Sequence, residues 1–471
     1  MQKLFITLFI FFIILISETF SQSYIVKFKN EKAARNYIQA NNIVLTSVFT
    51  IHNDKLKNQI QNNLDFNPNL YYKLITNNQD LIHNLSSNKD VDYVEPNHIY
   101  RLNQYKYNDS LYNYQWSLDV INARKSLSSV TGKGIKIAIV DSGIDFYHPD
   151  LQNQFMINPK EDLNGNGKFE PWDYREIRNG LSGDFNGKDD DGNGYADDVI
   201  GFDFVDLDFF QFGDWRNPDP IPDDEAGHGT NVASIVAAEG NNKIGMVGLA
   251  NQSKILNVRA FDITGNGETD DIANAIIYSA VRSVDIINMS FGDYFNSQLL
   301  EDAVRFASAM GCILVASSGN DDKVTPHYPS DFKDVISVGS SKKDGTRSSF
   351  SNWGVNLSLL APGEEVVTCE SGGGYGVAYG TSFSAPFVTA AIALYLENNT
   401  KPTSTEIRSH LDATARKLSP QGWLFKSGSG LLDVANFLTF EGLSNIEINS
   451  IDNYSTLNPN EISKISINAA T

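Results

Sequence analysis

Apolar residues gather in short, nearly continuous runs from about residue 130 onward, and amphipathic segments separate these runs. The runs are typical of strands that are buried on both faces, and they cover 135–141, 254–261, 284–291, 312–317 and 334–340. Two segments between them, 269–283 and 297–311, carry apolar residues at helical spacing, and the second ends at a glycine. The pattern predicts a three-layer α/β fold in which helices cover a mostly parallel central sheet.

A smaller α+β unit is predicted over residues 22–105. Residues 23–29 alternate as in a strand, residues 30–40 have a helical pattern, and residues 91–102 are extended around a proline. Residues 24–107 hold 10 Lys/Arg and 7 Asp/Glu, a net charge of +3. A slightly basic segment before a strongly acidic one fits a segment that docks on its own downstream domain.

Both ends of the chain have patterns of their own. An apolar run of 13 residues from Leu4 to Ile16 follows a single lysine, which predicts a signal peptide over 1–21 and a secreted protein. An uncleaved membrane anchor is the alternative, but the run is short for a bilayer. No other stretch approaches 18 apolar residues, so we expect no membrane association after signal removal. Residues 441–471 have strand-like runs and are expected to form a β extension or the start of a further domain.

The net charge of −20 argues against a nucleic-acid partner, because binding phosphates needs a basic surface. The acidic residues are concentrated in residues 161–225, which hold 19 Asp/Glu against 5 Lys/Arg. This block is either a metal-binding region or a solvated acidic loop region.

The chain has two cysteines, Cys312 and Cys369, too few for a disulfide scaffold. Cys312 begins an apolar run, which favours a buried free thiol over a bridge to Cys369.

Four polar residues stand where the predicted strands end or helices begin. Asp141 ends an apolar strand, His228 lies between two glycines at a helix start, Asn320 follows another strand, and Ser382 begins a helix. Ligand sites of parallel sheets lie beyond the carboxyl ends of the strands, so these residues can meet there. A serine, a histidine and an aspartate together make an activated nucleophile, and a side-chain amide can stabilise an oxyanion.

The motifs around these residues resemble those of the subtilisin family of serine proteases. They are IAIVDSGID, GHGTNVASIVAA, INMSFG, ASSGN and GTSFSAPFVTA, and they occur in the family's order of Asp, His and Ser. The resemblance covers about residues 108–440, and it implies a peptidase domain over 106–440. It implies that Asp141 orients the base, His228 is the general base and Ser382 is the nucleophile. Asn320 and the backbone N–H of Ser382 would bind the oxyanion.

The resemblance also implies a substrate site. The backbone of Ser290, Phe291 and Gly292 would pair with an extended polypeptide, and Ala316, Ser317 and Ser318 would wall the primary specificity pocket. Asp321 either reaches the pocket rim, where it would admit basic as well as apolar residues, or is a solvated loop residue. The family usually has Met where Phe383 stands and Ala where Ser384 stands.

The acidic insertion, residues 160–205, contains two loops with the spacing of calcium ligands, that is, oxygen ligands at alternate positions and a glycine at the turn. The ligands expected in the first loop are Asp162, Asn164, Asn166, Lys168 through its carbonyl, Glu170 and Asp173. Those expected in the second loop are Asp189, Asp191, Asn193, Tyr195, Asp197 and Asp198. The alternative for both loops is a glycine-rich, solvated acidic segment. We expect structural Ca²⁺.

Residues 22–105 resemble the family's inhibitory propeptide, which the new active site removes, here by a cut within 101–107. The sequence therefore predicts a secreted, self-maturing, monomeric endopeptidase that acts on polypeptides. The alternatives are a catalytically inactive relative that only binds proteins, an esterase, or a processing protease for one partner. In an esterase, the sharp turn that carries the nucleophilic serine would have the sequence G-x-S-x-G, and the segment around Ser382 does not.

Overall fold

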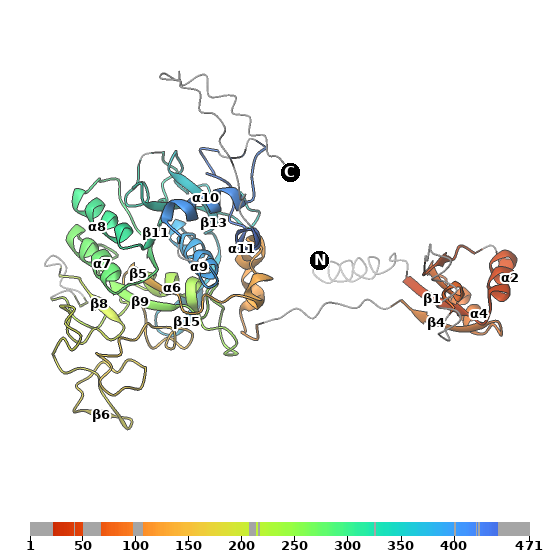
Figure 1. Cartoon of the computed structure of the whole chain (residues 1–471), viewed down its shortest axis with the longest axis horizontal. Helices are drawn as coiled ribbons and strands as arrows, with labels where there is room; N and C mark the ends of the chain where they lie inside the picture. Colours follow the sequence, from red (N-terminus) through yellow and green to blue (C-terminus); the bar gives the residue numbers. More distant parts are fainter. Residues whose placement is uncertain are drawn as a thin grey trace, which may run out of the picture. The chain divides into compact units, whose positions relative to one another are not determined.

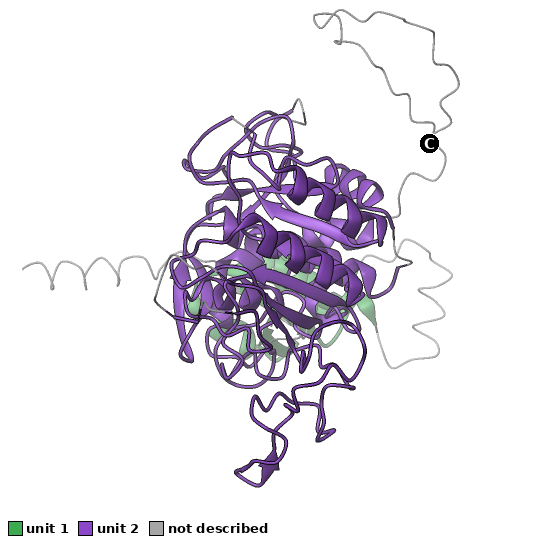
Figure 2. Ribbon diagram, turned by 90° about the vertical axis from the view of Figure 1, so that its left-hand side faces the viewer, with its two compact units in different colours: residues 1–103 green, residues 104–471 purple. Residues whose placement is uncertain are grey.

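The computed structural model describes residues 22–41, 43–49, 67–97, 107–206, 213–214, 217–324, 326–399, 402–420, 422 and 424–440. The chain divides into two compact units, residues 1–103 and 104–471 (Figure 2). The predicted signal peptide, the C-terminal extension and nearly all of the predicted cleavage segment lie outside the described residues.

In its described residues, unit 1 has a four-stranded antiparallel sheet and two α-helices, and the strand order is β2-β3-β1-β4 (Figure 1). Val26, Phe28, Leu74 and Leu85 are buried between the sheet and the helices. Its elements are β1 (Gln22–Phe28), α2 (Glu31–Asn41), β2 (Thr46–Ser47), η1 (Pro68–Leu70), β3 (Tyr71–Thr76), α4 (Gln79–Ser86) and β4 (Val91–Pro96).

Unit 2 is built on a seven-stranded sheet whose paired strands all run parallel. The strand order is β13-β12-β11-β10-β5-β9-β8. The strands are β5 (Lys136–Asp141), β8 (Gly201–Asp203), β9 (Lys254–Arg259), β10 (Ile286–Met289), β11 (Ile313–Ser317), β12 (Val335–Ser341) and β13 (Leu357–Pro362). The five predicted strands are all present, and the predicted α/β fold is confirmed.

Helices cover both faces of this sheet because successive strand residues point to opposite sides. On β5, Ile137 and Ile139 pack in the core under α6 (His228–Ala237) and α9 (Ala385–Leu396). Ala138 and Val140 pack in the second core under α7 (Thr269–Val281) and α8 (Gln298–Ala309), which lie side by side in Figure 1. Burial on both faces explains why the strands have no polar alternation.

The remaining elements complete unit 2. The helical ones are η2 (Tyr112–Tyr114), α5 (Trp116–Val120), η3 (Ser126–Ser128), η4 (Thr381–Phe383), α10 (Ser404–Thr414) and α11 (Val434–Thr439). Two antiparallel hairpins are β6 (Ile177–Arg178) with β7 (Leu181–Ser182) and β14 (Val366–Glu370) with β15 (Gly374–Ala378). The β6–β7 hairpin belongs to the acidic insertion, which projects from the rest of the unit (Figure 1).

Helix α9 is fastened at its far end to the segment that leads into β5. The carboxylate of Glu397, the residue after α9, accepts backbone N–H groups of Thr131 and Gly132, both at 2.7 Å, and of Lys133 at 3.3 Å. The contact spans more than 260 positions of the chain. It ties the helix that follows Ser382 to the strand that ends in Asp141.

Cys312 and Cys369 are both buried free thiols, so the bridge between them is not formed. Cys312 precedes β11 and donates to the carbonyl of Val284, whereas Cys369 lies on β14. Among the described helices, none is long and apolar enough to cross a membrane.

Candidate active site

One cleft at the carboxyl edge of the sheet brings together the residues that the sequence singled out. Asp141 is the last residue of β5, His228 is the first residue of α6, and Ser382 lies in η4, just before α9. Asn320 follows β11, and all four line the same cleft. The arrangement follows from the parallel sheet, because its strands deliver their ends to one edge.

Asp141 holds His228 by a short hydrogen bond of 2.7 Å between its Oδ1 and the ring Nδ1. The same oxygen accepts the backbone N–H of Ser142, and the side chain is almost fully buried. The close approach of α6 to β5 requires a glycine at position 229, since a Cβ there would lie 2.0 Å from the carbonyl oxygen of Gly143. The other ring nitrogen of His228 is left for the cleft.

The environment raises the pKa of His228 above its usual value. Burial of the ring disfavours the imidazolium, but the charge and hydrogen bond of Asp141, together with the charge of Asp224, outweigh that effect. The imidazolium is thereby stabilised, which is what a base needs when it takes a proton during the reaction.

Asp224 is a supporting residue that the sequence reading missed. Its buried carboxylate accepts hydrogen bonds from the Ser142 hydroxyl, from the Gly227 N–H, and from both the N–H and the hydroxyl of Thr230. These contacts fix the turn before α6 onto the residue after β5. Asp224 therefore positions His228 through this turn and not by a direct hydrogen bond.

The two serines of the GTSFSAP segment have different surroundings. Ser384 is buried, and its hydroxyl donates to the Pro362 carbonyl at 3.1 Å. Ser382 lines the cleft, and its backbone carbonyl accepts the Ser290 hydroxyl at 2.7 Å. Pro386 lies in the first turn of α9, where an N–H has no helical partner. The geometry thus leaves Ser382 as the hydroxyl exposed to a substrate.

Asn320 is oriented by Thr381. Its amide oxygen accepts the backbone N–H of Thr381 at 2.8 Å and the Thr381 hydroxyl at 2.9 Å. Because a backbone N–H can only donate, the oxygen of the amide must face Thr381. The NH₂ group of Asn320 is therefore the part that can donate to a substrate oxygen in the cleft.

The expected substrate-binding residues are only partly brought together. Ser290, Phe291, Gly292, Ser317 and Asp321 line the cleft. Ala316, by contrast, is buried in the core under α8, and Ser318 lines a separate small cavity. Strand alternation explains the difference, since Ser317 points to the opposite side from its two neighbours.

Further residues line the cleft that no motif indicated. They come from the loops after β9, β10 and β11 and include Phe261, Ile263, Tyr294 and His327. Their side chains come together only in the folded chain, and the sequence offers no spacing that marks them.

The first acidic loop gathers most of its expected ligands. The Asp162 carboxylate accepts backbone N–H groups of Gly165, Asn166 and Gly167, which winds the loop around it. The amide groups of Asn164 and Asn166 both contact one oxygen of Glu170, at 3.2 and 3.1 Å. The side chain of Lys168 is exposed.

Asp173 lies apart from this group. Both of its oxygens bind the Arg175 guanidinium, at 2.8 and 2.6 Å, and this contact lowers the pKa of Asp173 to about 2. Asp184, which the sequence reading missed, lies beside the loop instead. It is fully buried, one oxygen accepts the Glu170 N–H at 2.7 Å, and the other has no partner. Burial, with the nearby charges of Glu170 and Asp162, raises the pKa of Asp184 to about 7.

In the second loop, Asp189 accepts backbone N–H groups from Gly192, Asn193 and Gly194. Asp191 and Asn193 accept N–H groups two residues further along, whereas Asp197 accepts those of Asn186 and Gly187. The aromatic ring of Tyr195 packs against Phe202, Phe204 and Tyr278.

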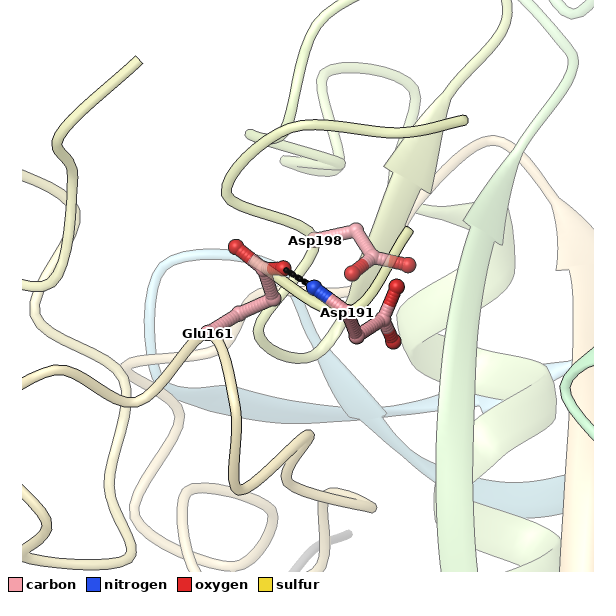
Figure 3. Close-up of side chains that lie close together, drawn as sticks. All are labelled: Glu161, Asp191 and Asp198. Carbon is pink, nitrogen blue, oxygen red and sulfur yellow. Dashed lines mark hydrogen bonds between the residues drawn. The ribbon is translucent and has the colours of Figure 1, made fainter. Parts of the chain in front are cut away.

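Glu161, another residue that the sequence reading missed, joins Asp191 and Asp198, and ligand atoms of the three lie within 4.8 Å of one another. Figure 3 shows the Asp191 and Asp198 carboxylates side by side, with Glu161 hydrogen-bonded to the Asp191 backbone. Asp198 is also paired with the buried guanidinium of Arg282.

The cleft brings a serine, a histidine and an aspartate to one edge of the sheet, which is the arrangement expected of a serine hydrolase. A sequence model of the Subtilase family matches residues 132–430 of the chain. The chain belongs to this family, and it is a serine-type endopeptidase.

Individual relatives agree with that assignment. A thermophilic serine proteinase of Bacillus sp. (strain AK1) is 33% identical over 346 residues, which is 73% of this chain and 72% of that protein. Subtilisin E of Bacillus subtilis (strain 168) is 30% identical over 355 residues, which is 74% of this chain and 76% of that protein. A solved protease of Pseudoalteromonas arctica PAMC 21717 superimposes with a TM-score of 0.57 at 25% identity, covering 71% of this chain and 99% of its own.

The raised pKa of His228 predicts where activity is lost on acidification. Because the base must be neutral, kcat/KM should fall as the pH drops through the pKa of His228, and the half-maximal point should lie above 6.5. A pH profile of peptide hydrolysis measures this midpoint. A midpoint below 6.5 would contradict the assigned effect of Asp141.

Phe383 predicts resistance to oxidation. Its ring packs 5.5 Å from that of His228, and the position carries no thioether that could be oxidised to a bulky, polar sulfoxide. After treatment with hydrogen peroxide, the wild-type enzyme should keep most of its activity, whereas Phe383→Met should lose most of it. Equal losses in the two proteins would show that this position does not govern oxidative inactivation.

Proposed function

We propose that the protein is a secreted, calcium-stabilised endopeptidase that cleaves polypeptides through Asp141, His228 and Ser382 and matures by removing its own N-terminal unit. The observation that carries this proposal is the 2.7 Å contact between Asp141 and His228 in the cleft that Ser382 and Asn320 also line. We expect the mature enzyme to be a monomer.

The catalytic cycle follows from the roles of these residues. The Ser382 hydroxyl attacks the peptide carbonyl carbon while His228 takes its proton, and the carbonyl π electrons move onto the oxygen. The NH₂ group of Asn320 and the backbone N–H of Ser382 donate to that oxyanion. Collapse of the intermediate breaks the C–N bond, and His228 gives its proton to the leaving amine. Water then releases the acyl group by the same steps in reverse order.

The N-terminal unit is proposed to be the enzyme's own inhibitor. Residues 22–105 contain a compact unit with its own core, and their excess of positive charge suits an acidic enzyme. Self-cleavage within residues 101–107 would release it. A signal peptide over 1–21 would direct the chain out of the cell.

Calcium fits the first acidic loop because the loop buries negative charge that no neighbouring cation offsets. Among the described residues, arginines pair with Asp173 and Glu176, and none pairs with Asp162, Glu170 or Asp184. An unpartnered oxygen on a fully buried Asp184 calls for a cation. We propose that Asp162, Asn164, Asn166, Glu170 and the Lys168 carbonyl hold Ca²⁺, with Asp184 closing the site in place of Asp173.

A second calcium ion is proposed for Asp189, Asp191, Asn193 and the Tyr195 carbonyl, with Glu161 nearby. Arg282 already neutralises Asp198, and Asp197 is engaged by backbone N–H groups, so these two act as supports for the loop. When bound, the ions offset carboxylate repulsion and hold the insertion in one conformation.

Paired serine variants test the proposed nucleophile. Ser382→Ala should lower peptide hydrolysis by about 10⁴-fold or more and leave the full-length precursor uncut. Ser384→Ala, two residues away, removes one buried hydrogen bond and should retain most activity. Hydrolysis rates and the mass of the purified chain measure both effects. A folded wild-type protein that binds peptides without cleaving them would favour the inactive binding relative instead.

The calcium proposal is tested in the Ser382→Ala background, where self-digestion cannot interfere. EDTA should lower the melting temperature, and added Ca²⁺ should restore it. Asp184→Asn should lose most of this calcium-dependent increase, while the matched variant Asp173→Asn should keep it. An unchanged melting temperature in EDTA, with no calcium found by native mass spectrometry, would refute the proposal.

A further inference from the structure

The cleft contains a second histidine, His327, which takes no part in the proposed catalytic steps. It lies in the loop after β11 and is 7% exposed, yet it lines the same cleft as Ser382. Its backbone N–H donates to Asp331 at 2.5 Å, and its carbonyl accepts the Ser330 hydroxyl at 2.7 Å. These contacts hold the loop and fix where the ring can lie.

The imidazole fills the space between the two walls of the pocket. A Cβ on Gly292, in the wall after β10, would lie 2.3 Å from the ring Cε1, and a Cβ on Gly319, in the wall after β11, would lie 2.9 Å from the ring Cδ2. Each glycine thus packs directly against one edge of the ring. The ring of Tyr294 contacts it edge-on, at 5.5 Å and 75°. The slot between the walls therefore ends on His327.

The charges around this ring are mostly negative. Asp293 faces it from the wall after β10, Asp321 from the wall after β11, and Asp331 from its own loop. Lys323 lies 3.7 Å from the Asp321 carboxylate and over the Tyr294 ring. Asp321 also accepts the Tyr294 hydroxyl, which links the two walls. Asp293 and Asp321 line the cleft itself, so the potential at this end of the cleft is negative.

We propose that His327 is the floor of the primary specificity pocket and that, as a neutral imidazole among these carboxylates, it selects lysine or arginine immediately before the scissile bond. The inference rests on the proposed endopeptidase function. The Ser330 hydroxyl donates to the His327 carbonyl and lies 3.5 Å from the ring Nδ1, so a neutral ring can donate from Nδ1 to that hydroxyl and keep a lone pair on Nε2. That lone pair can accept an N–H of a cationic side chain at the end of the slot.

The selection should disappear when the ring is protonated, because the floor then becomes a cation without a lone pair. Burial lowers the pKa of His327 below its usual value, although Asp331, Asp293 and Asp321 act against that shift. The ring is thus neutral at pH 7 and takes up its proton below pH 6.5. The pKa of His228 is shifted the other way, so the two titrations are separable.

The test compares two peptides that differ only before the scissile bond, one with lysine and one with the uncharged isostere norleucine. Values of kcat/KM are measured for the mature enzyme from pH 8 to pH 4.5. Taking the ratio of the two values at each pH cancels the titration of His228. For the wild-type enzyme, the lysine/norleucine ratio should exceed 1 at pH 8 and fall by about tenfold on acidification, with a midpoint below 6.5.

Two variants distinguish the effect of His327 on the lysine/norleucine ratio from the effect of Asp321. In His327→Asn, with His327→Gln as the substitute if the first does not fold, the ratio should be independent of pH down to about 5. In Asp321→Asn the ratio should be lower at every pH and should still fall on acidification, with a midpoint at lower pH than in the wild-type enzyme, because one charge that favours the imidazolium of His327 is removed. Melting temperature and titration of the reactive serine with a sulfonyl fluoride establish that each variant is folded.

The outcomes are distinct. Three results would refute the His327 proposal while the endopeptidase proposal stands, provided that the wild-type enzyme cleaves both peptides. They are a lysine/norleucine ratio below 1 at pH 8, a ratio that does not change with pH, and a change with pH that persists in the His327 variants. If the wild-type enzyme cleaves neither these peptides nor an unfolded protein, the endopeptidase proposal fails, and the pocket assignment fails with it.

Discussion

The contact between the end of β5 and the start of α6 is the constraint around which the cleft is organised. A buried carboxylate must have hydrogen-bond donors, and Asp141 finds them in His228 and in the backbone of Ser142. The helix can come this close only because residue 229 has no side chain, and Asp224 holds the connecting turn in place. The position of His228 is thus fixed by the sheet, by a glycine and by a second buried acid.

The sequence was informative where function depends on local pattern. Apolar runs located five of the seven parallel strands; β8 has only three residues, and Ser358 interrupts the apolar character of β13, so neither stands out. The four residues of the proposed machinery were found because each lies at a strand end or a helix start inside a recognisable motif. The distinction between Ser382 and Ser384 needed the structure, because it depends on Pro362 lying beside the second hydroxyl.

Sequence reasoning could not anticipate side-chain contacts that no spacing rule describes. The spacing predicts Asp173 as a ligand in the first acidic loop, whereas in the structure both of its oxygens bind Arg175, two residues further on. Asp184 lies outside the loop that the spacing predicts, and it is connected to that loop by the hydrogen bond that it accepts from the backbone N–H of Glu170. His327 and Tyr294 come from loops after different strands, and only the adjacent ends of β10 and β11 bring them together.

The clamp that Glu397 forms on Thr131, Gly132 and Lys133 has a consequence for how such an enzyme fails. Strand β5 ends in Asp141, and α9 follows Ser382. The Glu397 contacts connect these two elements a second time, at the end of β5 opposite to Asp141. A displacement of α9 would therefore move both β5 and the segment that carries Ser382, and it would separate Ser382 from His228. Early loss of the Glu397 contacts would therefore disrupt the proposed catalytic geometry before the whole unit unfolds.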